Sequence, residues 1–259
     1  MIEKITARTN ERIKYAVRLG ENASFRKTNG EFFLEGARLC SDAAKTGIVI
    51  KQAFFTVAAF EKYSAYAESI MQSGCICFEI STDVAKKLSG TENPQGVFCI
   101  CKARDADVAL RRDGKYLALE NLQDPSNLGA VCRSAEAIGL DGIIVSGGCD
   151  IYNPKALRAS MGSLLRLPVI ENPDMSGFVL SARQSGMKVY ASVPADDATD
   201  IRKADLSGGV IICIGNEGAG LSASTIKSCT DRVTIPMGGR AESFNASAAA
   251  AILAWELKR

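Results

Sequence analysis

The chain has 259 residues, and its 31 Lys and Arg against 29 Asp and Glu give a net charge of +2, a size that suits one large or two modest domains. Hydrophobic residues make up 47% and charged residues 23%, which is typical of a globular protein and excludes disorder, collagen-like repeats and a coiled-coil rod. The absence of His excludes His general bases, Ser–His and Cys–His nucleophile pairs and most zinc chemistry.

The first part of the chain, residues 1–104, is basic, with 15 basic and 11 acidic side chains. Short β-rich runs alternate there with helical stretches. The strands are expected at 32–34, 53–57, 75–80 and 97–101, and the helices near 36–46, 60–72 and 82–88. A polar stretch follows, and we take residues 105–114 as a linker.

Beyond the linker the alternation is more regular. Strands are expected at 116–120, 142–146, 187–193, 209–214 and 232–235, and helices near 127–139, 153–161, 175–185 and 245–257. Strands that alternate with helices of this length indicate βαβ units and a mainly parallel sheet. The sequence therefore predicts two α/β domains, a smaller one over 1–104 and a larger one over 115–259.

The nine Cys are an odd number and are scattered, so we expect reduced thiols rather than a secreted disulfide framework. The two Cys-x-Cys pairs lie in apolar runs and lack the usual zinc spacing, so no metal is expected. No segment approaches the ~20 apolar residues of a membrane span, and the N-terminus lacks a signal-peptide core. We expect a cytoplasmic protein that contacts no membrane.

A first group of polar residues follows strand 116–120, where Asp124 and Pro125 form a turn before a helix that begins near Ser126 or Asn127. The helix has an apolar stripe of Leu128, Val131, Cys132, Ala135 and Ile138. Arg133 lies about 160° from the centre of that stripe and points away from the core. Either Asn127 caps the helix and Arg133 is a surface residue, or both face a cleft beyond the carboxyl end of a strand.

A second group is the glycine-rich loop that follows strand 209–214. It contains Gly215, Asn216, Glu217, Gly218 and Gly220. The spacing is similar to a P-loop, but Leu221 stands where the phosphate-binding Lys must be, and the pattern is not G-x-G-x-x-G either. The glycines allow a close backbone approach to a ligand, or the loop is a plain tight turn.

A third group joins strand 232–235 to the last helix. Ile235, Pro236 and Met237 precede a Gly-Gly loop, and Ser243, Phe244 and Asn245 precede an Ala-rich helix. We expect its buried stripe to be Ala248, Ala251, Ile252 and Trp255. Ser243 and Asn245 could simply cap that helix.

In this order the three groups, over roughly 115–257, resemble the SpoU/TrmH branch of the SPOUT RNA methyltransferases. The signature of that branch is an N…R helix, a G-x-E-G loop and an I-P-M…S-[LF]-N segment, with Phe244 here where Leu is commoner. The segments 33–38 and 91–97 look like the substrate-binding domain of members that act on ribosomal RNA. The resemblance implies a C-terminal α/β trefoil-knot domain after a smaller, ribosomal-protein-like RNA-binding α/β domain.

The resemblance also implies a cofactor, S-adenosylmethionine, a knot made by threading the last helix through a loop, and a homodimer in which each subunit completes the other's site. The implied cofactor residues are Gly215, Asn216, Gly218, Gly220, Ile235, Met237 and Phe244. Candidate RNA contacts are the basic residues Lys4, Arg8, Arg12, Lys14, Arg26, Lys27 and Arg38. A solvated helix face is the alternative for the cluster in residues 1–27.

The implied reaction transfers a methyl group to a ribose 2′-oxygen, with Arg133 as the family's proposed catalytic residue. A guanidinium does not lose its proton in proteins, so we expect Arg133 to grip a phosphate and stabilise the developing alkoxide. Asn127, Glu217, Ser243 and Asn245 would hold Arg133, the ribose and the cofactor loop. Ribosomal RNA is favoured over tRNA through the N-terminal resemblance. A base-methylating SPOUT enzyme and a non-catalytic RNA-binding protein of this fold are the alternatives.

Overall fold

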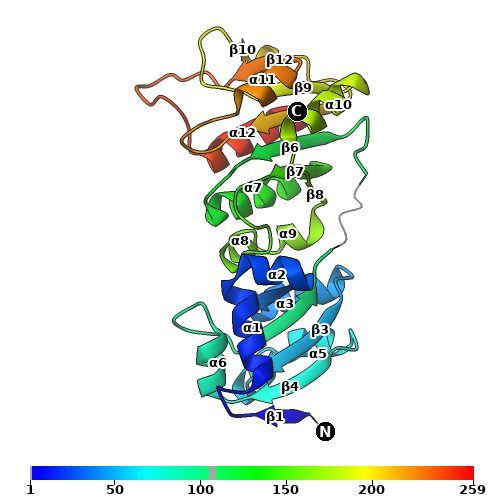
Figure 1. Cartoon of the computed structure of the whole chain (residues 1–259), viewed down its shortest axis with the longest axis vertical. Coiled ribbons are helices and arrows are strands. Elements are labelled where there is room, and N and C mark those ends of the chain that lie inside the picture. The colour runs from blue at the N-terminus through cyan, green and yellow to red at the C-terminus, as the bar shows by residue number, and fades with distance from the viewer. Residues whose placement is uncertain (1, 105–108) are drawn as a thin grey trace. The chain divides into compact units, whose positions relative to one another are not determined.

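The computed structural model describes residues 2–104 and 109–259 (Figure 1). They form two compact units: residues 2–104 with the later segment Tyr152–Leu165, and residues 109–151 with 166–259. Part of the expected linker, 105–108, lies outside the described residues. The packing of Tyr152–Leu165 with the first unit has no signal in the sequence pattern.

The first unit contains a five-stranded sheet. Its order is β1 (Glu3–Ile5), β4 (Ile76–Ile80), β3 (Ile50–Phe55), β5 (Val97–Lys102) and β2 (Glu31–Glu35). Strand β5 runs antiparallel to both neighbours, and the other pairs are parallel. The helices are α1 (Glu11–Glu21), α2 (Ala23–Asn29), α3 (Ala37–Lys45), α4 (Val57–Lys62), α5 (Ser64–Met71), α6 (Thr82–Leu88) and α8 (Pro154–Ala159), which packs on β2. Stacked Phe rings fill the core, as Phe54 and Phe78 do at 5.4 Å.

Two features of this unit differ from the expectation. The single helix near 60–72 is two helices, because Thr56 caps α4 by accepting a hydrogen bond from the Ala59 amide and the chain breaks at Tyr63. The elements β1 and α2 were not expected, and α1 was expected only as the alternative interpretation of residues 1–27, a solvated helix face. Strand β1 has three residues and is stabilised by parallel pairing with β4, a long-range contact that local pattern does not encode.

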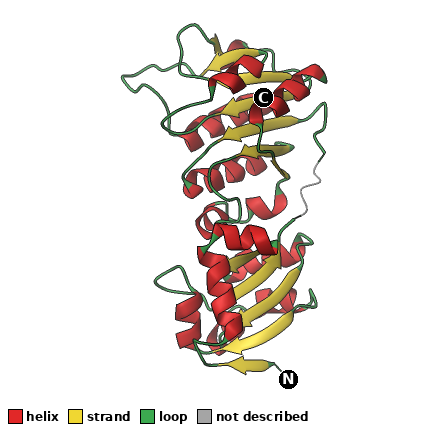
Figure 2. Cartoon of the chain, in the orientation of Figure 1, coloured by secondary structure: helices red, strands yellow, loops and turns green. Residues whose placement is uncertain are grey.

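The second unit contains a seven-stranded sheet whose neighbouring strands are all parallel. Its order is β10 (Thr199–Asp200), β12 (Asp231–Thr234), β9 (Lys188–Ser192), β11 (Val210–Ile214), β6 (Lys115–Glu120), β7 (Gly142–Ser146) and β8 (Val169–Glu171). The helices are α7 (Pro125–Ile138), α10 (Met175–Gln184), α11 (Ala223–Ser228) and α12 (Ala246–Lys258), with a 3₁₀ turn at Ile201–Lys203. The short helix α9 (Ser163–Arg166) begins in the segment that belongs to the first unit. The predicted α/β architecture is confirmed (Figure 2).

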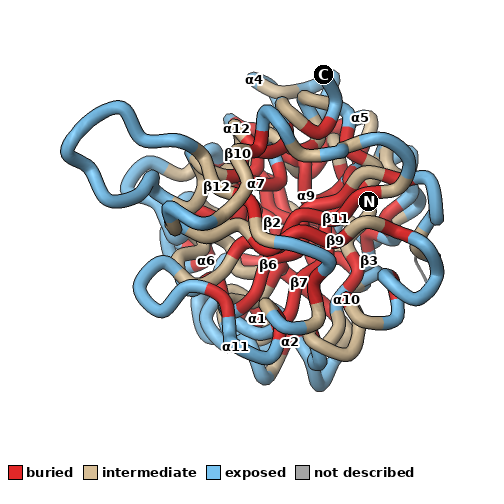
Figure 3. Tube along the Cα trace, turned by 90° about the horizontal axis from the view of Figure 1, so that it is seen from above, coloured by how far each residue is buried: buried red, intermediate tan, exposed pale blue. Residues whose placement is uncertain are grey.

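The central strands of this sheet are buried along nearly their whole length (Figure 3). Helices cover both faces of such a sheet, which is why its strands are continuous apolar runs. The carboxyl ends of parallel strands share one edge, where α/β proteins place ligands. The connections after β6, β9, β11 and β12 therefore begin at the same edge, and the one between β12 and α12 is the orange-red loop in Figure 1.

The predicted buried stripe of α12 is wrong. The buried residues are Ala250, Leu253, Ala254 and Leu257, while Ala248 is exposed and Trp255 is 63% exposed. The helix packs on α7, β6 and β11 with the other face. An Ala-rich helix is apolar nearly all round, so periodicity does not identify the face that is buried.

No described helix has the length and apolar character needed to span a bilayer. Within the described ranges, no three His, Cys, Asp or Glu side chains gather in a way that could hold a metal ion. All nine cysteines are free.

Candidate cofactor and active site

A cavity of about 480 Å³ lies at the carboxyl ends of β9, β11 and β12. The segment after β9, the glycine-rich loop after β11, the segment after β12 and the start of α12 line it. All seven expected cofactor residues are among the lining residues: Gly215, Asn216, Gly218, Gly220, Ile235, Met237 and Phe244. Three distant parts of the sequence thus meet at one hollow.

Asn216 shapes the glycine-rich loop. Its backbone exchanges two hydrogen bonds of 3.0 Å with Gly220, and its Oδ1 accepts from the amides of Gly218 and Ala219 at 2.9 Å. Gly220 has a φ of +68°, and a Cβ on Gly215 would stand 2.1 Å from the Gly220 carbonyl carbon. The loop needs glycine at both positions because one takes the left-handed region and the other touches backbone.

Glu217, in the middle of that loop, finds its partners at the start of α7. Its carboxylate accepts from the amide of Gln123 at 3.1 Å, the amide of Asp124 at 3.2 Å and Nδ2 of Asn127 at 3.0 Å. Desolvation raises the pKa of Glu217, but the hydrogen bond from Asn127 and those from the backbone outweigh it, so its pKa lies below the usual value. The loop is therefore held by an ionised carboxylate.

Asn127 also contacts the third group. Its Oδ1 accepts from Nδ2 of Asn245 at 3.2 Å, while Asn245 caps α12 by accepting from the Ser247 amide. Helix α7 begins at Pro125 with Asp124 as its cap, so the alternative in which Asn127 caps it is wrong. Asn127 lies in the first turn and is buried. It connects the glycine-rich loop to the last helix.

Glu120, at the end of β6, is a site residue that sequence analysis missed. It is buried, and its carboxylate accepts from the amide and the hydroxyl of Ser222 at 2.8 Å and from the hydroxyl of Thr225 at 2.7 Å. It thereby fixes the far end of the glycine-rich loop, where α11 begins. An acidic residue at the end of an apolar strand was the available signal.

Arg133 and Ser243 are placed differently from Asn127. Ser243 is exposed and lines the cavity. Arg133 is exposed on α7, as the helical spacing predicts, but is not a lining residue of the cavity. Six residues along a helix correspond to a rise of about 9 Å and a turn of about 240°, so Arg133 and Asn127 point in different directions.

The lining suits S-adenosylmethionine. The volume falls in the usual range for small-molecule sites of about 300–1,000 Å³. Apolar side chains of Ile235, Met237 and Phe244 can cover a purine, and the glycine-rich loop offers backbone groups without side chains in the way. Met237 and Phe244 are exposed without a ligand, by 36% and 43%, which fits side chains that a cofactor covers.

Some of the basic residues expected to contact RNA interact with other protein groups in the first unit, and others are exposed. Lys4 pairs with Glu79 and Lys14 with Glu11, each at 2.7 Å, and Arg12 lies over the Phe78 ring. Arg26 is buried and donates to the carbonyls of Leu19 and Gly20 at the end of α1. Its prediction as an RNA contact is wrong, because this guanidinium serves the fold. Arg8, Lys27 and Arg38 are exposed.

A parallel α/β sheet with this cavity and the Asn127–Glu217–Asn245 connection defines a SPOUT-fold, S-adenosylmethionine-dependent RNA methyltransferase. The chain matches the SpoU rRNA Methylase family over residues 114–255 and the MRM3-like substrate binding domain over residues 10–99. The protein belongs to the SpoU rRNA Methylase family and is an RNA ribose 2′-O-methyltransferase.

Relatives match along the whole chain. A 23S rRNA (guanosine(2553)-2′-O)-methyltransferase, RlmP of Bacillus subtilis, is 30% identical over 99% of this chain and 100% of that protein. A 23S rRNA (uridine(2479)-2′-O)-methyltransferase of Streptomyces viridochromogenes is 30% identical over 99% and 92%. The AdoMet-bound rRNA methyltransferase of Sinorhizobium meliloti superposes with a TM-score of 0.88 at 29% identity, over 99% of this chain and 97% of that one.

Proposed function

We propose that the chain methylates a ribose 2′-hydroxyl of 23S ribosomal RNA in the cytoplasm. The observation that supports this proposal is that the same relatives match both units of the chain. Full-length relatives named for 23S rRNA cover 99% of the chain, including the N-terminal substrate-binding domain. The two relatives act on a guanosine and a uridine at equal identity to this chain, so identity alone does not select the nucleotide.

S-adenosylmethionine supplies an electrophilic methyl group on its sulfonium. The chain's own residues hold that group in place and position the ribose: Glu217 and Asn127 fix the glycine-rich loop, and Asn245 fixes the start of α12. Ser243 is exposed at the cavity and offers a hydroxyl to the ribose. Alignment of the attacking oxygen with the methyl group accounts for much of the rate of such transfers.

Arg133 is the proposed catalytic residue. Its guanidinium stays charged, so it grips a phosphate next to the target and stabilises the oxygen as that oxygen loses its proton. Arg133 is exposed and lies outside the lining of its own chain's cavity. We therefore propose that it acts at the site of a second subunit.

A homodimer is the proposed assembly. The support is the apolar face that α12 leaves exposed, with Trp255 63% exposed, Ala248 exposed and Ile252 half-buried. An exposed Trp beside small apolar residues is typical of protein interfaces. The face lies on the helix whose first turn lines the cofactor cavity, so a partner docked there stands close to the site.

The experiment is transfer of labelled methyl from S-adenosylmethionine to total RNA from cells that lack the protein, with Arg133→Ala alongside. We expect a labelled 2′-O-methylnucleoside in large ribosomal RNA, absent with the variant. Label in tRNA would overturn the target, and label on a base would overturn the ribose assignment. Absence of label with intact cofactor binding would favour a non-catalytic RNA-binding protein.

A further inference from the structure

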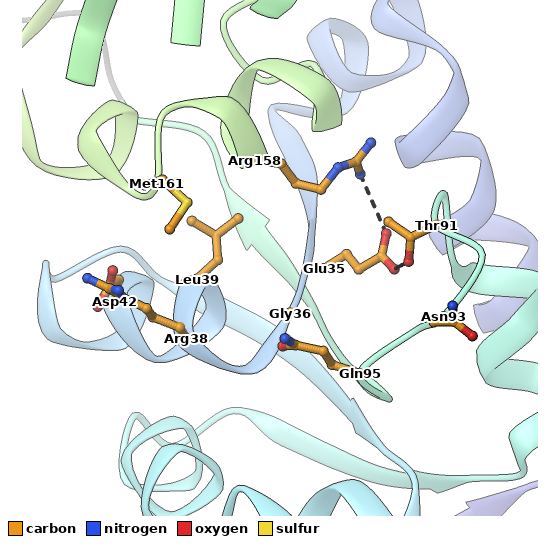
Figure 4. A pocket seen from close by; sticks show the side chains of 10 residues that line it. All are labelled: Glu35, Gly36, Arg38, Leu39, Asp42, Thr91, Asn93, Gln95, Arg158 and Met161. Atoms are coloured by element: carbon orange, nitrogen blue, oxygen red, sulfur yellow. Dashed lines mark hydrogen bonds and ion pairs between the residues drawn. The ribbon is translucent and has the colours of Figure 1, made fainter. Parts of the chain in front are cut away.

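A second cavity, of about 420 Å³, lies in the first unit, far along the sequence from the cofactor loops (Figure 4). It is formed where β2 ends and α3 begins, by the loop between α6 and β5, and by α8 with the residues after it. Side chains that matter here are Glu35, Arg38, Leu39, Gln95, Arg158 and Met161. The cavity is large enough for one nucleotide by the usual size of ligand sites.

The walls of this cavity are tied together before any ligand arrives. Glu35 is buried and accepts from the Gly90 amide at 3.1 Å, from the Thr91 hydroxyl at 2.9 Å and from the Ser89 hydroxyl. Arg158 forms an ion pair with the same carboxylate at 3.5 Å, the dashed contact in Figure 4. Gln95 Oε1 accepts from the Ala37 amide at 2.9 Å. A preformed pocket of this kind binds without a large ordering cost.

Arg38 is the cation that this arrangement leaves available. It is exposed, lines the cavity and makes no hydrogen bond or ion pair with the rest of the described chain. Gly36, with a φ of +110°, turns the chain into α3, whose first amide, that of Ala37, already donates to the Gln95 side chain. An exposed guanidinium of this kind favours a phosphate oxygen, because it donates charge-assisted hydrogen bonds.

Leu39 and Met161 supply the apolar part. Met161 is 46% exposed and has a φ of +50°, in the left-handed region that non-glycine residues seldom adopt. Figure 4 shows the two side chains pointing toward each other at one end of the cavity. A thioether and an aliphatic side chain can pack on the flat face of a base, and such conformations concentrate where a ligand is held.

The charges of the lining limit the ligand further. Two guanidiniums, Arg38 and Arg158, face two carboxylates, Glu35 and Asp42, and both carboxylates are already engaged. A cavity lining with equal numbers of positive and negative side chains does not favour a polyphosphate. It fits an uncharged base with a single phosphate at its edge.

We propose that this cavity holds one unstacked nucleotide of the RNA substrate, with its phosphate at Arg38 and its base against Leu39 and Met161. Asn93 and Gln95 also line the cavity. Unpaired, splayed-out nucleotides are what proteins recognise in RNA by pockets and edge contacts. The inference rests on the proposed function, because it takes RNA as the substrate.

A binding experiment tests the phosphate contact. The probe is a fluorescein-labelled, mixed-sequence, single-stranded RNA of 12 nucleotides, with the full chain as Arg38→Gln and, as control, Lys45→Gln on the same helix. We expect Arg38→Gln to raise Kd about tenfold, the effect of one charge-assisted hydrogen bond. The slope of log K against log salt should fall by about 0.7, the value of one phosphate contact. Equal effects of the two variants would overturn the proposal.

A second experiment tests the base contact. The full chain is labelled with ¹³C-methyl methionine, and the Met161 resonance is identified by its loss in Met161→Leu. RNA should shift the Met161 resonance and leave that of Met71, in the same unit, unchanged. No Met161 shift at saturating RNA, or an equal shift of Met71, contradicts the proposal. If free GMP or AMP shifts the Met161 resonance with the same affinity as the RNA does, the cavity is a mononucleotide site and the proposal is overturned.

Methyl-transfer kinetics distinguish a failure of the nucleotide site from a failure of the proposed function. Arg38→Gln should raise KM for ribosomal RNA about tenfold and leave kcat in place, since it removes a binding contact. Transfer to ribosomal RNA with an unresponsive Met161 refutes the nucleotide site alone. A responsive Met161 without transfer refutes the proposed function alone.

Discussion

Asn127 donates from Nδ2 to Oε1 of Glu217 at 3.0 Å, a contact between residues 90 positions apart. Because the other end of the same amide accepts from Asn245, one buried side chain holds together the start of α7, the glycine-rich loop and the start of α12. Geometry at the cofactor cavity therefore depends on a short chain of amides and one carboxylate. Its members can be removed one at a time.

Glu217→Gln should weaken S-adenosylmethionine binding about tenfold, because an amide places a donor against the backbone donors that Glu217 now accepts from. Since the folded pKa of Glu217 is lowered, its contribution is present above the ordinary pKa of 4.5 and is lost as pH falls through the folded pKa. Titration calorimetry from pH 7 down through that folded pKa should show wild-type affinity falling as the carboxylate becomes protonated, and Glu217→Gln affinity flat over the same range. The same dependence of affinity on pH in the two proteins would contradict this prediction. The control is Glu242→Gln, in the exposed loop before α12.

Glu120→Gln should reduce the free energy of unfolding by about 1–3 kcal/mol, the cost of leaving buried donors without their acceptor. The Ser222 amide and the hydroxyls of Ser222 and Thr225 lose the carboxylate that satisfies them. Urea unfolding measures the change, again beside Glu242→Gln. An unchanged midpoint would show that Glu120 does not fix the end of the loop.

Arg133→Ala should lower kcat about 10²- to 10³-fold, the size of a lost alkoxide-stabilising contact, and leave cofactor affinity unchanged. If Arg133 acts on the partner's site, an equimolar mixture with a Gly215→Ala protein, whose loop cannot close, should regain about a quarter of wild-type activity, since half of the dimers carry one complete site. No recovery, with mixed dimers demonstrated by mass, would place Arg133 at its own chain's site.

If the proposed homodimer forms through the apolar face of α12, Trp255→Glu should convert it to a monomer, because the substitution puts a charge on that face. We expect the dimer Kd to rise at least about 30-fold, the effect of an interface residue that contributes roughly 2 kcal/mol or more. Sedimentation equilibrium measures it, with Tyr66→Glu, another exposed aromatic residue, as control. If the unsubstituted chain is monomeric, or if the variant stays dimeric, the exposed face of α12 is not the dimer interface.

Much of the second unit could be predicted because its strands are continuous apolar runs and each functional loop begins where such a run ends. The parallel sheet followed from that, whereas the seven cofactor residues that gather at one cavity were implied by the family resemblance. Strands β8 and β10, of three and two residues, could not be predicted, since pairing with distant partners rather than local pattern stabilises them.

Side-chain partners were harder to predict than elements. Arg26 and Arg38 look alike in the sequence, yet one is buried on backbone carbonyls and the other lines a cavity. Trp255 was expected to be buried and is exposed. In each case a contact between distant segments decides the outcome, and a single sequence does not record such contacts.

The ring of Phe32 on β2 stacks on Tyr152 at 4.3 Å, although 120 residues separate them. During synthesis, which adds about 5–20 residues per second, the first 104 residues emerge well before the segment that covers this ring. The segment that covers this ring therefore arrives only after β7 of the next unit has been made. A fragment cut at residue 104 would leave the Phe32 side chain without its stacking partner.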